Sequence, residues 1–95
     1  MIKVTAEFVL KAGAYEKAIS IANELIKLTR LEKGCVAYDL AKSNDDENVL
    51  VMFETWESQA ALQKHSASAH FAALVPEFAA LCSVAPAIKT FTQVI

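Results

Sequence analysis

The sequence predicts an α+β domain, because the spacing of its apolar residues switches between a strand period and a helix period along the chain. Residues 2–10 alternate between apolar and mostly polar side chains, which is typical of a strand with one covered face. From residue 14 the apolar residues recur every three or four positions, and this helical stripe stops before Gly34, a residue suited to a left-handed helix cap. The pattern therefore predicts a strand followed by an amphipathic helix.

Two further strands are predicted in the middle of the chain. One runs from Cys35 to about Lys42, and residues 43–48 (SNDDEN) supply a turn. Residues 49–53 are all apolar, as expected of a strand that is covered on both faces.

The last third of the chain predicts helix and then strand. Ser58 can cap a second helix, and either Ser66 or Ser68 can start a further helical segment. Pro76 is expected to kink or restart that segment, since proline lacks the amide N–H that a helix interior uses. Residues 87–95 are rich in β-branched and aromatic side chains and predict a final strand.

The resulting order is strand, helix, strand, strand, helix, strand. This order is that of ferredoxin-like, split βαβ domains, in which the helices cover one face of a four-stranded antiparallel sheet. We expect residues 1–95 to form a single domain. Because 55% of the residues are apolar and the mean hydropathy is +0.32, we also expect the open sheet face to be buried in a homodimer.

Composition also argues against several classes of protein. No apolar run reaches the roughly 20 residues that a membrane-spanning helix needs, and residues 1–10 lack the layout of a signal peptide, so a cytoplasmic protein is expected. The net charge of −2, without a basic stripe, argues against a nucleic-acid partner. Cys35 and Cys82 stand apart in apolar surroundings, as buried cysteines of a reducing compartment do.

Four polar-tipped side chains of one stretch, FETWESQAALQKHSASAHF, are expected to pack into an otherwise apolar neighbourhood: Glu54, Trp56, His65 and His70. An ionisable group among apolar residues is costly unless it is paired or used. The two-residue period of a strand places Glu54 and Trp56 on the same face as Met52. If this face meets the helices, Glu54 and Trp56 border the interior, and burial would raise the pKa of Glu54 and make it a stronger base.

The spacing of the two histidines does not predict a metal site. His65 and His70 are five residues apart, which places them roughly 140° apart around an uninterrupted helix. They therefore lack the i,i+4 spacing of a helical metal-binding pair. A helix break between Ser66 and Ser68 would leave their relation open, and these two serines are interpreted as caps rather than nucleophiles.

Three segments resemble the antibiotic biosynthesis monooxygenase family, a group of small dimeric α+β barrel proteins. They are residues 32–38 (EKGCVAY), 53–58 (FETWES) and 65–71 (HSASAHF), and the similarity in order and spacing covers nearly the whole chain. The resemblance implies chemistry without metal, flavin or haem, in which an electron-rich phenol or quinol is deprotonated and its anion passes an electron directly to O2.

The resemblance also implies roles for individual side chains. The candidate bases are Glu54 and His65. The candidate contacts to a small aromatic or hydrophobic substrate are Trp56, Tyr38, Met52, His70 and Phe71. Three of these residues also have a purely structural interpretation: Trp56 packs in the core, Glu54 forms an ion pair, and Tyr38 lies in a dimer interface.

The sequence departs from parts of the family pattern. Met52 stands where some polyketide oxygenases carry an Asn, and His65 and Val75 stand where haem-degrading relatives carry a Trp and a His, so haem degradation is not expected. Two other functions stay open. One is an isomerase of a small phosphorylated metabolite, for which Arg30 or Lys64 would have to bind the phosphate; the other is a non-catalytic dimer that binds a small hydrophobic ligand.

Overall fold

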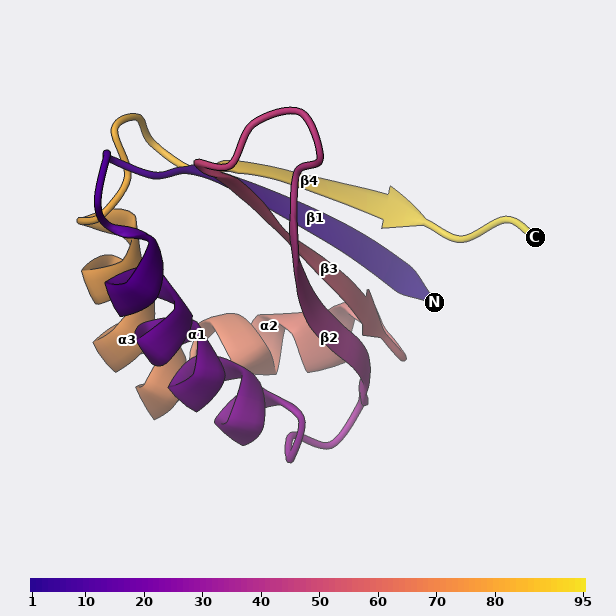
Figure 1. Ribbon diagram of the computed structural model, residues 1–95. Coiled ribbons are helices and arrows are strands. Elements are labelled where there is room, and N and C mark those ends of the chain that lie inside the picture. Colours follow the sequence, from indigo (N-terminus) through magenta and orange to yellow (C-terminus); the bar gives the residue numbers. More distant parts are fainter.

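The computed structural model describes residues 1–95 and contains one four-stranded antiparallel sheet with three helices on one of its faces (Figure 1). In chain order the elements are β1 (Ile2–Val9), α1 (Tyr15–Thr29), β2 (Cys35–Lys42), β3 (Val49–Trp56), α2 (Gln59–Ser66), α3 (Ala69–Ala79) and β4 (Ala87–Thr92). The strand order in the sheet is β2-β3-β1-β4. The ferredoxin-like α+β fold predicted from the sequence is therefore confirmed, with its second helical region divided in two.

Strand β1 lies in the middle of the sheet and pairs with β3 on one side and β4 on the other. Its alternating residues Val4, Ala6 and Phe8 face the helices and are buried, as the period of the sequence predicts. The ring of Phe8 meets that of Phe78 in α3 edge to face, with 4.5 Å between the ring centroids. These contacts join the sheet to the helical layer.

Strand β3 presents one face to the helices. Leu50, Met52, Glu54 and Trp56 are all buried on this side. The opposite side of β3 is not covered within one chain, because the helices lie on only one face of the sheet (Figure 1). Phe53 on the open side is 49% exposed.

Gly34 does not cap the first helix, contrary to the expectation. α1 ends at Thr29 with Arg30 in the right-handed conformation, and the chain then makes further turns before β2. Gly34 has φ +90°, and a Cβ built on it would come within 2.6 Å of the Cβ of Ala61 in α2. Glycine is required there because the turn is left-handed and the backbone passes close to α2.

The helical region after β3 is divided by two serine caps. Ser58 accepts a hydrogen bond from the backbone three residues on at the start of α2, and Ser68 does the same for α3. α3 extends through Pro76, so the predicted kink or new start there was wrong as a helix boundary. Only the N–H of Pro76 itself is lost to the helix, and its carbonyl still accepts from Ala80.

Strand β4 is an edge strand and ends three residues earlier than predicted. Its last residue, Thr92, pairs with Ile2 at the beginning of β1, and the chain beyond it leaves the sheet (Figure 1). Every residue of β4 is exposed. No helix of the chain combines the length and apolar character needed to cross a bilayer.

Candidate functional site

A cavity of about 110 Å³ lies between the sheet and the helices. Fifteen residues line it, and eleven of these are hydrophobic. Its ionisable lining residues are Tyr38, Glu54 and His65. An apolar cavity of roughly 150 Å³ binds benzene in another protein, so this space suits about one small aromatic ring.

Glu54 reaches the cavity from the helix-facing side of β3. Its Oε1 accepts a 2.9 Å hydrogen bond from Nε1 of Trp56, which lies two residues along the same strand. Burial raises the pKa of the Glu54 carboxyl above its usual value, the Trp56 hydrogen bond opposes this effect, and the charge of Glu32 adds to it. One carboxyl oxygen is therefore fixed in position while the group is made more basic.

Tyr38 comes from β2 directly opposite Glu54 in the register of the sheet. The side chain is buried, and its ring lies edge to face against Trp56 and His65. Burial raises the pKa of the Tyr38 phenol, and the neighbouring Glu54 charge raises it further. The phenol thus keeps its proton near neutral pH and can act as a hydrogen-bond donor.

His65 lies in the last turn of α2 and is only 2% exposed. Its ring centroid is 4.7 Å from that of Trp56 and 5.1 Å from that of Phe71. Burial lowers the pKa of His65, although the hydrogen bond and the charge of Glu32 act in the opposite direction. The lowered pKa favours the neutral imidazole, which is the form that can accept a proton.

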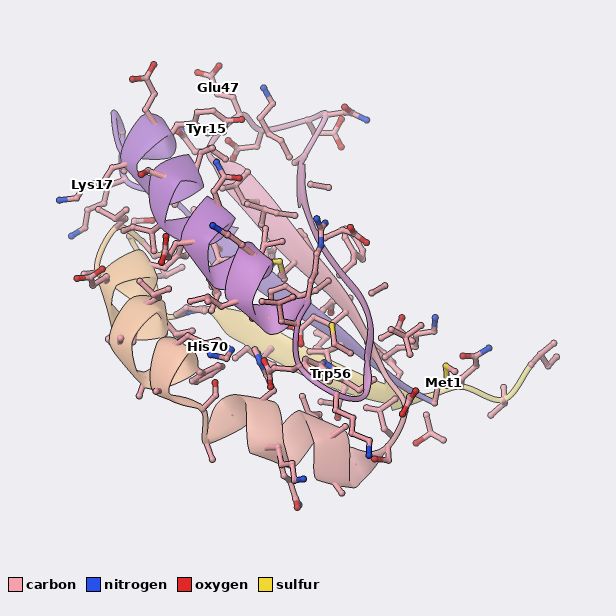
Figure 2. All side chains as sticks on the ribbon, turned by 90° about the horizontal axis from the view of Figure 1, so that it is seen from below. Met1, Tyr15, Lys17, Glu47, Trp56 and His70 are labelled. Atoms are coloured by element: carbon pink, nitrogen blue, oxygen red, sulfur yellow. The ribbon has the colours of Figure 1, made fainter.

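Glu32, in the loop between α1 and β2, brings the two histidines together. Its Oε2 lies 2.7 Å from Nδ1 of His65 and 2.9 Å from Nε2 of His70. The 140° separation of an uninterrupted helix does not apply here, because the chain breaks at Ala67 and starts α3 in a new direction, which is the case that the sequence left open. Figure 2 shows His70 projecting from α3 toward the interior.

The hydrogen-bond network assigns the protons of both imidazoles. A carboxylate can only accept, so His65 Nδ1 and His70 Nε2 each donate to Glu32. The hydroxyl proton of Ser68 is directed to the carbonyl of His65 at 2.7 Å, so its oxygen is also an acceptor toward His70 Nε2 at 3.2 Å. His65, a residue of the cavity lining, is then left with an unprotonated Nε2.

Two imidazoles and a carboxylate are also a ligand set that zinc uses, and here the three ligand atoms lie within 4.8 Å of one another. The two N–O distances to Glu32, 2.7 and 2.9 Å, are those of charge-assisted hydrogen bonds. The ligands of a tetrahedral zinc ion lie about 3.3 Å apart, given metal bonds of about 2.0–2.1 Å. The observed spacing fits a hydrogen-bonded cluster better than a metal centre.

The residues singled out in the sequence fall into two groups. Those that line the cavity are Tyr38, Met52, Glu54, His65 and Phe71. Trp56 and His70 stand behind this lining: Trp56 is fully buried between β3 and α2 and holds Glu54, whereas His70 contacts Glu32 (Figure 2). Sequence reasoning missed Glu32 as a site residue, although it begins the EKGCVAY segment.

The fold and the site define a small α+β protein with an apolar cavity and a few ionisable groups inside it. Residues 1–77 match the family model described as "Antibiotic biosynthesis monooxygenase". The chain is 36% identical over 75 residues to "Putative monooxygenase YcnE" of Bacillus subtilis, covering 79% of each protein. It is 36% identical over 70 residues to "Putative monooxygenase Rv0793" of Mycobacterium tuberculosis, covering 74% of this chain and 68% of the relative.

A solved structure named "Crystal structure of antibiotic biosynthesis monooxygenase" superimposes with a TM-score of 0.94 at 34% sequence identity, over 100% of both chains. The chain belongs to the antibiotic biosynthesis monooxygenase family.

Proposed function

We propose that this protein is a cofactor-independent monooxygenase that oxidises a small, single-ring quinol or phenol with O2. One observation carries the proposal: Tyr38, Glu54 and His65 converge on an apolar cavity whose volume, about 110 Å³, suits one aromatic ring. An apolar wall excludes water, and the three polar groups supply the proton transfer and hydrogen bonds that such a reaction needs.

His65 acts as the base in this proposal. Its neutral imidazole takes the proton of a substrate hydroxyl at Nε2, so that the substrate becomes an electron-rich anion. The Tyr38 hydroxyl donates a hydrogen bond to the oxyanion, and the Glu54 carboxyl accepts one from the second hydroxyl of a quinol. The Glu54 carboxyl is held in place for this by Trp56.

The reaction balances without a further reductant. A hydroquinone and O2 give a hydroxyquinone and water, with the substrate supplying all four electrons. The anion reduces O2, one oxygen atom forms a new C–O bond with the ring, and the O–O bond breaks. The C–H bond at the attacked ring carbon also breaks. Its proton and the proton held on His65 Nε2 both go to the departing oxygen, which leaves as water.

The isomerase alternative receives no support from the site. The cavity lining contains no Lys or Arg that could bind a phosphate group. Arg30 lies at the surface, where it pairs with Asp39 at 2.9 Å and donates to the carbonyl of Tyr38 at 3.1 Å. Lys64 is exposed on α2.

The proposal includes a homodimer formed through the open faces of two sheets. Phe53 of β3 and Phe91 of β4 expose about half of their surface on this side, 49% and 50%. Half-buried Val49 and Val51 of β3 lie on the same face. Burying these side chains against a second copy would account for the high apolar content of the chain.

The test is oxygen uptake by metal-free protein with a panel of single-ring hydroquinones and catechols, and with two-ring naphthohydroquinones for comparison. We expect turnover of single-ring substrates above their autoxidation rate. We also expect loss of turnover in His65→Gln, with a circular dichroism spectrum like that of the parent. Autoxidation rates throughout the panel would overturn the proposal, and thermal stabilisation by a ring compound without any product would point to a non-catalytic binding protein.

A further inference from the structure

We propose that Glu32 and His70 are positioning residues for His65. In this arrangement Glu32 fixes the imidazole with its proton on Nδ1 and its lone pair on Nε2 toward the cavity, and His70 holds the Glu32 carboxylate. The inference rests on the proposed function for its kinetic consequences, whereas the proton positions that it assigns do not depend on any reaction.

The geometry of one oxygen atom carries the proposal. Oε2 of Glu32 accepts from His65 at 2.7 Å and from His70 at 2.9 Å, so both of its lone pairs are used. The donors come from different helices, and the carboxylate comes from the loop after α1. The exposed fraction of the side chains rises from 3% at His65 to 16% at Glu32 and 18% at His70. The cluster therefore runs from the cavity wall toward the surface.

The Glu32 carboxylate solves two problems that a buried histidine base has. A neutral imidazole that exchanges freely between its two tautomers would carry its proton on Nε2 part of the time. In that form Nε2 could not accept a proton from a substrate. A buried imidazole also resists protonation, and an adjacent carboxylate stabilises the imidazolium that forms during proton transfer. Glu32 meets both requirements from one oxygen.

His70 fixes the side chain of Glu32, whereas the surrounding loop fixes only its backbone. The backbone of Glu32 is fixed by turn hydrogen bonds to Thr29 and Cys35, but the side chain has no other donor than the two imidazoles. Donation from His70 therefore selects the rotamer in which Oε2 points at His65. Ser68 caps α3 and lies 3.2 Å from the same His70 nitrogen, which fixes the position of the His70 ring.

The competing explanation is purely structural: the cluster could join a loop and two helices without affecting the base. The two explanations differ in what Glu32→Gln does, since glutamine keeps the shape but removes the charge and can donate to Nδ1. We expect kcat to fall about 10²- to 10⁴-fold, by comparison with an Asp→Asn change beside a catalytic histidine. KM should change little. The acid limb of the kcat/KM profile should move to lower pH, because the pKa of His65 falls when the neighbouring charge is removed.

His70→Gln should produce the same changes at a smaller size, about tenfold in kcat. Glu57→Gln is the matched control, because it removes an exposed carboxylate near the end of β3 and should leave kcat and the pH profile unchanged. A Glu32→Gln variant with parental kcat and pH profile, and only a lower Tm, would overturn the proposal in favour of the structural explanation.

Nitrogen NMR of the imidazoles separates this inference from the proposed reaction. In the parent protein near pH 7.5 we expect His65 protonated at Nδ1 and His70 at Nε2, and in Glu32→Gln we expect His65 to shift toward the Nε2-protonated form. His65 protonated at Nε2 in the parent would overturn the inference even if oxygen uptake were found. If the spectrum is as expected but no oxygen uptake is found, the positioning of His65 stands and the proposed reaction is overturned.

Zinc binding gives a further test. Stoichiometric binding that activates the metal-free protein, and that is lost in His70→Gln, would replace the proposal with a metal site.

Discussion

Trp56 and Glu54 form a buried hydrogen bond within one strand, from Nε1 of the indole to Oε1 of the carboxyl at 2.9 Å. Side chains two positions apart on a strand lie on the same face, so the pairing follows directly from the backbone. It satisfies the indole N–H, which is fully buried, and it fixes one oxygen of a carboxyl that borders the cavity. The strand thereby supports and orients its own ionisable group.

Trp56→Phe should leave this carboxyl without its donor. Because the Trp56 hydrogen bond opposes the effect of burial, we expect the pKa of Glu54 to rise further when it is lost. The smaller ring should also lower the free energy of unfolding by about 2–3 kcal/mol. Infrared titration of the carboxyl band measures the pKa, and urea denaturation measures stability. A Glu54 pKa equal to that of the parent would show that the hydrogen bond has no such role.

Glu54→Gln should improve stability at neutral pH while it reduces activity. The pKa of Glu54 is raised in the folded protein, so folding favours the protonated carboxyl, and this advantage is lost as the pH rises above about 4.5 and through the folded pKa. Glutamine can still accept from Trp56 but never ionises. The stability difference in favour of Glu54→Gln should therefore grow between pH 4 and pH 8.

Urea denaturation across that pH range measures the difference. Glu24→Gln, which changes an exposed carboxyl of α1, serves as the control and should show no such trend. The argument would be contradicted if Glu54→Gln were less stable than the parent at pH 8 and the stability difference were the same at pH 4.

Gly34→Ala should be more destabilising than Gly13→Ala. Both glycines have positive φ, so alanine costs roughly 1–2 kcal/mol of backbone strain at each position. Only at Gly34 does the added Cβ collide with another side chain, Ala61 at 2.6 Å, whereas nothing lies within 4 Å at Gly13. We expect a total cost of about 2–4 kcal/mol at Gly34. Equal midpoints of thermal unfolding in the two variants would show that the close approach of Gly34 to α2 does not affect stability.

Phe53→Asp should convert the proposed dimer into a monomer. The change places a charge in the centre of the open sheet face, next to Asp39 in the register of β2 and β3, and burying it against a second copy would be unfavourable. Light scattering after gel filtration measures the mass. Leu31→Asp is the control, because Leu31 is 80% exposed in the loop after α1, away from that face. A monomeric parent protein at micromolar concentration would contradict the dimer.

Local periodicity was sufficient to predict the fold and one side of the site. The alternation of side chains in β1 and β3 predicts which residues face the helices, and it places Glu54 on the same face as Trp56. The capping serines likewise follow from a short-range rule, since their partners lie only three residues away.

The role of Glu32 could not be found in the same way. Its partners His65 and His70 lie 33 and 38 residues away, and they meet only because the chain changes direction at Ala67. The angle between α2 and α3 depends on packing against the sheet, which no spacing along the sequence reports. The same reasoning explains Gly34, whose need for glycine arises from the approach of Ala61.

Oxidation with isotope-labelled dioxygen tests the central claim most directly. Metal-free protein is mixed with a single-ring hydroquinone under labelled O2 in unlabelled water, with catalase present, and the product is analysed by mass spectrometry. The account predicts a hydroxyquinone that carries one labelled oxygen atom per turnover, with the other atom in water, and no enzymatic product from His65→Gln. Quinone formed without the label, with O2 released only as hydrogen peroxide, would contradict it.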